Sequence, residues 1–161
     1  MASAWVPIEY YDYRPANLIL SNLSSGHADL TSLPFEDDSI ESISCMHTIE
    51  HVGLGRYGDP LDADGDLKAI AELQRVTKPG GSILFVVPVG TSRIIFNAHR
   101  IYSYEQVLSY FNTQCILKDC FLIPDDALTS GPIEHAAAAD VAKQTYGCGC
   151  FWFEKKSPNL L

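Results

Sequence analysis

The stretch that decides the fold is ADLTSLPFEDDSIESISCMHTIEHV, residues 28–52, together with LQRVTKPGGSILFVVPVG, residues 73–90. Residues 40–46 and 83–87 are short apolar runs bounded by turn-forming residues, which predicts two strands. Residues 66–78 lie between them and carry apolar side chains at helical spacing, with aspartates before them and a KPGG turn after them. Strands that alternate with a helix in this way predict an α/β domain.

Shorter segments on either side extend this pattern. Ile8–Tyr13 is predicted to be a strand, because Pro15 disfavours a helix running up to it. His27–Leu30 is a second short strand, and Ser103–Gln106 has the residues of a capping box that opens a helix. We expect these strands to be parallel to those at 43–46 and 83–87. The C-terminal part should add an antiparallel pair of strands at residues 115–123 and 148–154. An alanine-rich helix or lid at residues 135–142 is expected between them.

Length and composition indicate one soluble domain spanning residues 1–161. A net charge of −9 argues against a nucleic-acid partner, because such binding depends on clustered Lys and Arg. The longest apolar run, Ile83–Val89, is too short to cross a membrane and is interrupted by Pro88. The start of the chain lacks the features of a signal peptide. Five cysteines without a CxxC pair are typical of reduced thiols, so a cytoplasmic location is expected.

Three patterns resemble known binding motifs but lack the expected surroundings. Gly53–Gly58 satisfies GxGxxG, yet no helix follows it, so a surface loop is expected. Asp62–Asp66 resembles a calcium loop, but its glycine is misplaced and the closing glutamate is replaced by Leu73. Cys148 and Cys150 form a CxC pair without a second pair of ligands at the spacing of a zinc finger.

His47–His51 matches HxxEH, the inverted zinc-peptidase signature. Its two histidines would share a face only if the segment were helical. The residues before it are predicted to be a strand, and Gly53 soon follows. The third ligand would have to come from Asp125, Asp126 or Glu134. We therefore expect no metal site here, with a zinc site as the alternative.

Several features together resemble class I S-adenosylmethionine-dependent methyltransferases. Tyr10-Tyr11-Asp12 puts a carboxylate at the end of a strand, and Asp29-Leu30 follows the next strand. The segment FEDDSIES then leads into a strand that ends in SCMHTIEH, and KPGG leads into the following one. The sequence is most similar to an uncharacterised methyltransferase-like family of unknown function, in which HxxEHVGLGRYGDPLDxDG and FNAHRIYS recur.

This resemblance implies a Rossmann-like fold and S-adenosylmethionine as the cofactor. Asp12 would bind the ribose hydroxyls, and Asp29 and Leu30 would lie beside the adenine. Met46 and His47 would lie near the methyl group. His47 is the candidate catalytic base and His99 the second candidate, with a structural hydrogen-bonded histidine as the alternative for both. The loops facing a small-molecule substrate would carry three further residues, for which solvent-exposed surface roles are the alternative: Arg56, Arg100 and Tyr102.

The sequence also departs from the methyltransferase pattern. Only Met1–Pro7 precede the first predicted strand, so we expect an N-terminally incomplete fold without the first strand, glycine loop and first helix. S-adenosylmethionine should then bind weakly or not at all. Methyl transfer to a small-molecule oxygen or nitrogen is one hypothesis. The other is a non-catalytic remnant or a binding subunit completed by a partner chain.

The missing strand would leave a gap between the strands that end at Asp12 and Met46. Unpaired strand edges are templates for pairing with another chain. We therefore expect these two strands either to contact each other directly or to mediate self-association into a homo-oligomer.

Overall fold

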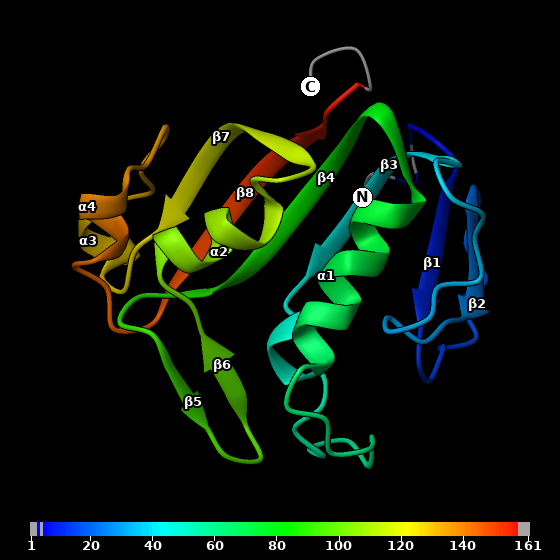
Figure 1. Ribbon diagram of the computed structural model, residues 1–161, viewed down its shortest axis with the longest axis horizontal. Coiled ribbons are helices and arrows are strands. Elements are labelled where there is room, and N and C mark those ends of the chain that lie inside the picture. The colour runs from blue at the N-terminus through cyan, green and yellow to red at the C-terminus, as the bar shows by residue number, and fades with distance from the viewer. Residues whose placement is uncertain (1–2, 4, 158–161) are drawn as a thin grey trace.

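A computed structural model describes residue 3 and residues 5–157 of the chain, and it shows a mixed α/β fold (Figure 1). The strands are β1 (Ile8–Asp12), β2 (Leu23–His27), β3 (Ile40–Met46), β4 (Thr77–Val89), β5 (Arg93–Ile95), β6 (His99–Ile101), β7 (Cys115–Ile123) and β8 (Gly147–Lys155). The helices are the 3₁₀ turn η2 (Ile49–His51) and the α-helices α1 (Gly65–Val76), α2 (Tyr104–Phe111), α3 (Ala127–Ser130) and α4 (Ala138–Val141).

The main sheet contains four strands in the order β3-β4-β8-β7. β3 and β4 are parallel, whereas β8 is antiparallel to both β4 and β7. The predicted parallel strands at 43–46 and 83–87 and the predicted antiparallel C-terminal pair are therefore confirmed. The alanine-rich segment contributes only the one-turn helix α4.

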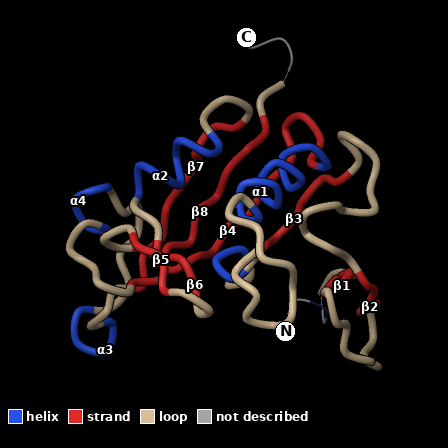
Figure 2. Tube along the Cα trace, turned by 60° about the horizontal axis from the view of Figure 1, so that its bottom comes forward, coloured by secondary structure: helices blue, strands red, loops and turns tan. Residues whose placement is uncertain are grey.

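β1 and β2 form a separate parallel pair, with Ile8 opposite Leu23 and Asp12 opposite His27. Figure 2 shows this pair set apart from β3 at one end of the main sheet. Among the described residues, no strand pairing joins β1 to β3. Direct pairing across the predicted gap, one of the two expected outcomes, is therefore not observed.

Two element boundaries differ from the sequence prediction. The second strand ends at His27 instead of spanning residues 27–30, because Asp29 forms a turn in which its carboxylate accepts from the Thr31 N–H at 2.8 Å. The KPGG segment is the start of β4 instead of a turn outside it. Gly81 allows this close pairing, since a Cβ atom there would lie 2.9 Å from the Glu41 carbonyl oxygen.

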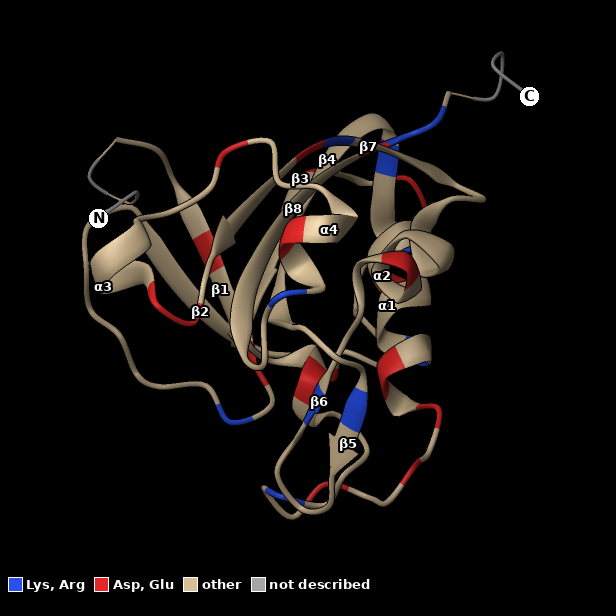
Figure 3. Ribbon diagram, turned by 90° about the vertical axis from the view of Figure 1, so that its left-hand side faces the viewer, with Lys and Arg blue, Asp and Glu red and all other residues tan. Residues whose placement is uncertain are grey.

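Helices α1 and α2 pack on one face of the main sheet, to the right of the sheet in Figure 3. α1 is held by its apolar stripe, which buries Ile70 and Leu73. α2 begins at the predicted capping box, in which the Ser103 side chain accepts from the Gln106 N–H. The face beneath them is aromatic, with the Phe111 and Phe153 rings stacked at 4.2 Å.

The opposite face of the main sheet is only partly covered. Apolar side chains along it keep large exposed fractions, 57% for Met46, 39% for Leu84 and 42% for Trp152. The Trp152 indole N–H donates to the Ser82 hydroxyl at 3.1 Å on this face. In the part of the chain that the structure describes, no helix has the length and apolar character needed to span a membrane.

The aromatic core predicts the effect of one substitution. Phe111 is fully buried between Phe85 and Phe153, so Phe111→Ala should lower the free energy of unfolding by about 3–5 kcal/mol. Phe96 is 81% exposed, so Phe96→Ala is the matched control and should change stability by less than about 0.5 kcal/mol. Urea unfolding followed by circular dichroism measures both. Equal stability of the two variants would contradict this description of the core.

Candidate functional site

The carboxyl ends of the parallel strands form one edge of the molecule. In Figure 1 the arrows of β1, β2, β3 and β4 all point toward the lower part of the view. The loop at residues 52–64 and the hairpin formed by β5 and β6 lie at the same edge. Ligands of open α/β sheets bind outside the carboxyl ends of the strands, so this edge is the candidate site.

Asp12 and Asp29 are brought together at this edge. Asp12 is the last residue of β1, and its carbonyl oxygen accepts from the N–H of Ala28, the residue before Asp29, at 3.1 Å. The Asp12 carboxylate accepts from the Arg14 N–H at 2.8 Å and from the Tyr10 hydroxyl at 2.8 Å. The bond from its hydroxyl raises the pKa of Tyr10. The two carboxylates thus follow neighbouring parallel strands.

Asp29 uses only part of its hydrogen-bonding capacity. Its Oδ1 accepts from the Thr31 N–H at 2.8 Å and from the Thr31 hydroxyl at 2.7 Å. A carboxylate has about four lone-pair positions, so further donors can be accommodated. Leu30 is half-buried against the core, whereas Met46 at the end of β3 is largely exposed.

The GxGxxG segment is a loop built around Asp59. The Asp59 carboxylate accepts from the N–H groups of Gly53, Gly55 and Tyr57. Burial raises the pKa of Asp59, but these backbone donors outweigh it and lower the pKa overall. The segment therefore has an internal structural role, and in the structure it does not connect a strand to a helix.

The exposed end of this loop lies against the turn after β1. The guanidinium of Arg14 donates to the Tyr57 carbonyl oxygen and lies 5.9 Å from the Tyr57 ring centroid. Arg56 lies over the same ring at 5.6 Å and is exposed. Arg56 is thus exposed and lies near the turn after β1.

Arg100 and Tyr102 form a buried polar group with Asp66. Arg100 Nε lies 3.3 Å from the Asp66 carboxylate, and the Tyr102 hydroxyl donates to that carboxylate at 3.0 Å. Arg100 also donates to the Val52 carbonyl oxygen at 2.6 Å. Its charge is therefore satisfied within the protein. Burial, together with the Asp66 charge, raises the pKa of Tyr102 well above its ordinary range. Arg100 and Tyr102 still border a small pocket of about 200 Å³ beside β5 and β6.

His47 lies immediately after β3 in a left-handed backbone conformation, with φ of 50°. Its Nδ1 is 3.1 Å from Oε1 of Glu50, and its Nε2 is 3.3 Å from Sγ of Cys148. Glu50 is 1% exposed, and its Oε2 has no hydrogen-bond partner among the described residues. His47 itself is about half exposed, so a buried carboxylate orients an accessible imidazole.

His99 lies in a second histidine cluster at the same edge. Its ring is 6.2 Å from that of His51 and 5.1 Å from that of Tyr146. Burial and the neighbouring His51 lower the pKa of His99. The Nδ1 of His51 contacts the Ala98 carbonyl oxygen at 2.5 Å, which ties η2 to the turn between β5 and β6.

The HxxEH segment is a strand end followed by a 3₁₀ turn, not an α-helix. His51 is held by Ala98, and His47 faces Glu50 and Cys148. Among the residues that the structure describes, no three His, Cys, Asp or Glu side chains are placed to hold a metal ion.

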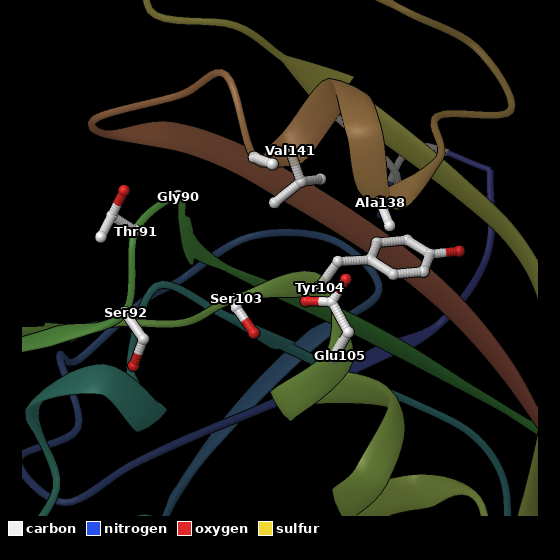
Figure 4. A pocket seen from close by; sticks show the side chains of 9 residues that line it. Gly90, Thr91, Ser92, Ser103, Tyr104, Glu105, Ala138 and Val141 are labelled. Atoms are coloured by element: carbon white, nitrogen blue, oxygen red, sulfur yellow. The ribbon is translucent and has the colours of Figure 1, made fainter.

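A second pocket, of about 250 Å³, lies where β4 ends (Figure 4). The view shows Val141 and Ala138 of α4 on one side and Tyr104 and Glu105 of α2 on another. None of the site residues predicted from the sequence lines it. Its volume is also below the roughly 300 Å³ at which ligand pockets begin. We therefore place the site at the strand ends and not in this pocket.

The sequence pointed to Glu50 only as the glutamate of the HxxEH motif, and it treated Cys148 and Cys150 only as weak zinc ligands. One available signal was the CxC spacing, because residues two apart on a strand share a face. The contact between His47 and Cys148 joins residues far apart in the sequence, so no local pattern could reveal it.

Solved structures share this fold at low sequence identity. The [4+2]-cyclase SpnF superposes with a TM-score of 0.55 and 15% identity, over 84% of this chain and 56% of the cyclase. YcgJ from Bacillus subtilis superposes with a TM-score of 0.54 and 17% identity, over 85% of this chain and 73% of YcgJ. The third structure is the N-methyltransferase NodS from Bradyrhizobium japonicum in complex with S-adenosyl-L-homocysteine. It superposes with a TM-score of 0.54 and 13% identity, over 86% of this chain and 57% of NodS.

These similarities show that the chain has the Rossmann-like fold of S-adenosylmethionine-dependent methyltransferases. The chain spans little more than half the length of the cyclase and of NodS. No curated protein sequence matches it significantly. A family model described as "Caenorhabditis protein of unknown function, DUF268" matches residues 21–113, which is more than half of the chain. The chain therefore belongs to the DUF268 family.

Proposed function

We propose that this protein is a methyltransferase-like protein that binds S-adenosylmethionine mainly through its adenosine part. The observation that supports this is the placement of Asp12 and Asp29 after adjacent parallel strands, joined by the hydrogen bond from Ala28. A carboxylate accepts two hydrogen bonds from a ribose diol, and a second one accepts from an adenine amino group. The pair of carboxylates therefore supports the proposal of an adenosine half-site.

The methionine half of the cofactor fits the described residues less well. β1 and β3 belong to separate sheets, and no glycine-rich turn after a strand lies between them among the described residues. The backbone donors that would hold the methionine part are therefore lacking in this region. Binding by this chain alone should be weak and should depend on the adenosine moiety.

Methyl transfer, where it occurs, is proposed to go to a small-molecule oxygen or nitrogen. The bound cofactor would supply an electrophilic sulfonium methyl group. His47 would accept the proton of an oxygen nucleophile through Nε2, which must first exchange its contact with Cys148 for the substrate. Glu50 holds the other ring nitrogen and fixes the orientation of the imidazole. Met46 would lie beside the methyl group and His99 near the acceptor. Arg56, Arg100 and Tyr102 would border the substrate.

Calorimetric titration with adenosine, S-adenosylhomocysteine and S-adenosylmethionine tests the half-site. All three should bind with similar dissociation constants, on the order of 10⁻⁴ to 10⁻³ M, because the methionine part adds few contacts. Asp12→Asn should weaken binding by about tenfold or more, because it removes the charge that strengthens hydrogen bonds from the ribose. Glu9→Gln removes a charge from the exposed side of the same strand and serves as the control.

Two outcomes would contradict the half-site. One is the absence of saturable binding of any of the three ligands at millimolar concentration. The other is a Kd for S-adenosylmethionine far below that for adenosine, which would mean that the chain recognises the methionine part as strongly as the adenosine part.

The second candidate function is a non-catalytic binding subunit that self-associates or is completed by a partner chain. β3 is an edge strand of the main sheet, and Ser42, Ser44 and Met46 along it are exposed. Exposed apolar side chains continue from this edge across the neighbouring strands to Leu84 and Trp152. An exposed edge strand leaves backbone N–H and C=O groups unpaired, which favours pairing with a second copy of the chain.

Light scattering coupled to size-exclusion chromatography measures this association. The chain should form a dimer or larger species at micromolar concentration. Met46→Lys should shift it toward the monomer, because a charge on an edge strand opposes pairing. Leu128→Lys is the control, since Leu128 is an exposed apolar residue too but lies on α3, away from this edge. A wild-type chain that stays monomeric throughout this range would rule out self-association.

A further inference from the structure

Two thiols lie together on the partly covered face of the main sheet. Cys148 and Cys150 are two residues apart on β8, and their Sγ atoms are 3.9 Å apart. Gly149 between them faces the helices, where a Cβ atom would lie 2.7 Å from Val89 Cγ1. The alternation of β8 therefore places both thiols on the same face and leaves them partly exposed.

The two thiols lie within hydrogen-bonding distance of each other. A hydrogen bond from the Cys148 thiol lowers the pKa of Cys150 to about 7, despite its partial burial. The same hydrogen bond, together with burial and the charge on Cys150, raises the pKa of Cys148. Burial raises the pKa of the other three cysteines: Cys115 to about 11, and Cys45 and Cys120 to about 12. At neutral pH the nucleophilic thiolate is therefore concentrated in the pair on β8.

His47 places a base beside this pair. Its Nε2 is 3.3 Å from Cys148 Sγ, and its Nδ1 faces the buried Glu50 carboxylate at 3.1 Å. When Nδ1–H donates to Glu50, Nε2 is left as an acceptor that can take the Cys148 proton once Cys150 no longer accepts it. A nucleophile, a base within hydrogen-bond reach and a third group that orients the base form a recurrent arrangement for activating a thiol.

From this geometry we propose that Cys148 and Cys150 form a redox-active dithiol, which hydroperoxides oxidise to an intramolecular disulfide with His47 as the base. Neither methyl transfer nor cofactor binding is needed for this reaction. The site consists of residues from β8, the end of β3 and η2, all of which the structure describes.

The reaction has two steps. The Cys150 thiolate attacks the terminal oxygen of the hydroperoxide, so the O–O bond breaks, an alcohol leaves after protonation, and Cys150 becomes a sulfenic acid. His47 Nε2 then takes the proton of Cys148, whose sulfur attacks the sulfenic sulfur. The S–O bond breaks, and the departing hydroxide takes a proton and leaves as water. The dithiol loses two electrons when it becomes the disulfide, and these electrons reduce the hydroperoxide to alcohol and water.

The strand geometry makes this disulfide easy to reverse. Residues i and i+2 of a strand have Cα atoms about 6.6–6.8 Å apart, which is at the upper end of the range that a disulfide spans. Closing the bond therefore strains β8, and strained disulfides are reduced readily by thiols. Oxidation would also replace the Cys148 thiol beside His47 with a disulfide sulfur and so change the surroundings of the base proposed for methyl transfer.

The test uses the reduced full chain treated with hydrogen peroxide and then quenched with N-ethylmaleimide. Intact-mass and peptide analysis should show loss of two hydrogens, with the new bond between Cys148 and Cys150. Dithiothreitol should restore both thiols. Cys45, Cys115 and Cys120 are buried and should be alkylated only after denaturation, so they are controls within the same chain.

Three variants separate the two steps. Cys148→Ser should halt the reaction at a Cys150 sulfenic acid, which a 1,3-diketone traps. Cys150→Ser should slow oxidation at this site at least about tenfold, because the low-pKa thiol is gone. His47→Asn retains a residue that tolerates positive φ. It should slow disulfide closure at least about tenfold, while sulfenic acid forms at the wild-type rate.

Other results would overturn the proposal. These include oxidation no faster at the pair than at the buried cysteines, a bond from Cys150 to Cys120, a disulfide between two chains, or a sulfenic acid that persists in the wild type. An unchanged closure rate in His47→Asn would remove His47 from the reaction. Because all of these readouts are made without S-adenosylmethionine, failure of the proposed cofactor site would not affect them.

Discussion

The antiparallel register between β4 and β8 is the constraint on which most of this structure depends. It pairs Phe85 with Phe151 and Val86 with Cys150, so one set of alternating residues faces the helices and the other faces away. The first set forms the aromatic core under α2. The second set places the thiols and Trp152 on the partly covered face. A shift of one residue would exchange the two faces, burying the cysteines and exposing the phenylalanines.

The carboxyl edge is organised by two buried acidic residues. Asp66 is paired with Arg100 and Tyr102, and this group also holds the carbonyl oxygen of Val52 at the start of the loop. Glu50 contacts His47 and leaves one oxygen without a partner among the described residues. Burying a carboxylate is costly unless it is paired, so the fully paired Asp66 stabilises the edge. Glu50, which has a hydrogen-bond partner for only one of its oxygens among the described residues, contacts His47, the base in both proposed reactions.

His47 connects the two proposals. It follows β3 at the edge where methyl transfer is proposed, and the same side chain contacts a thiol from β8. A single imidazole cannot accept a proton from both groups at once through the same nitrogen. The redox state of the cysteine pair would therefore determine whether Nε2 faces a thiol or is available to a substrate.

The sequence by itself determined the α/β class, the strands from Ile40 to Met46 and from Ile83 to Val87, and the capping box at Ser103, because these depend on local periodicity and turn chemistry. It also anticipated that Asp12 ends a strand, whereas Asp29 lies in a turn after the neighbouring strand instead of ending it. It misplaced the second strand and the start of β4, where a turn and strand pairing override local preference. Only the tertiary structure decided that Arg100 is buried against Asp66 and that His47 lies between Glu50 and Cys148. Such contacts depend on the register between distant strands, which no local pattern in the sequence encodes.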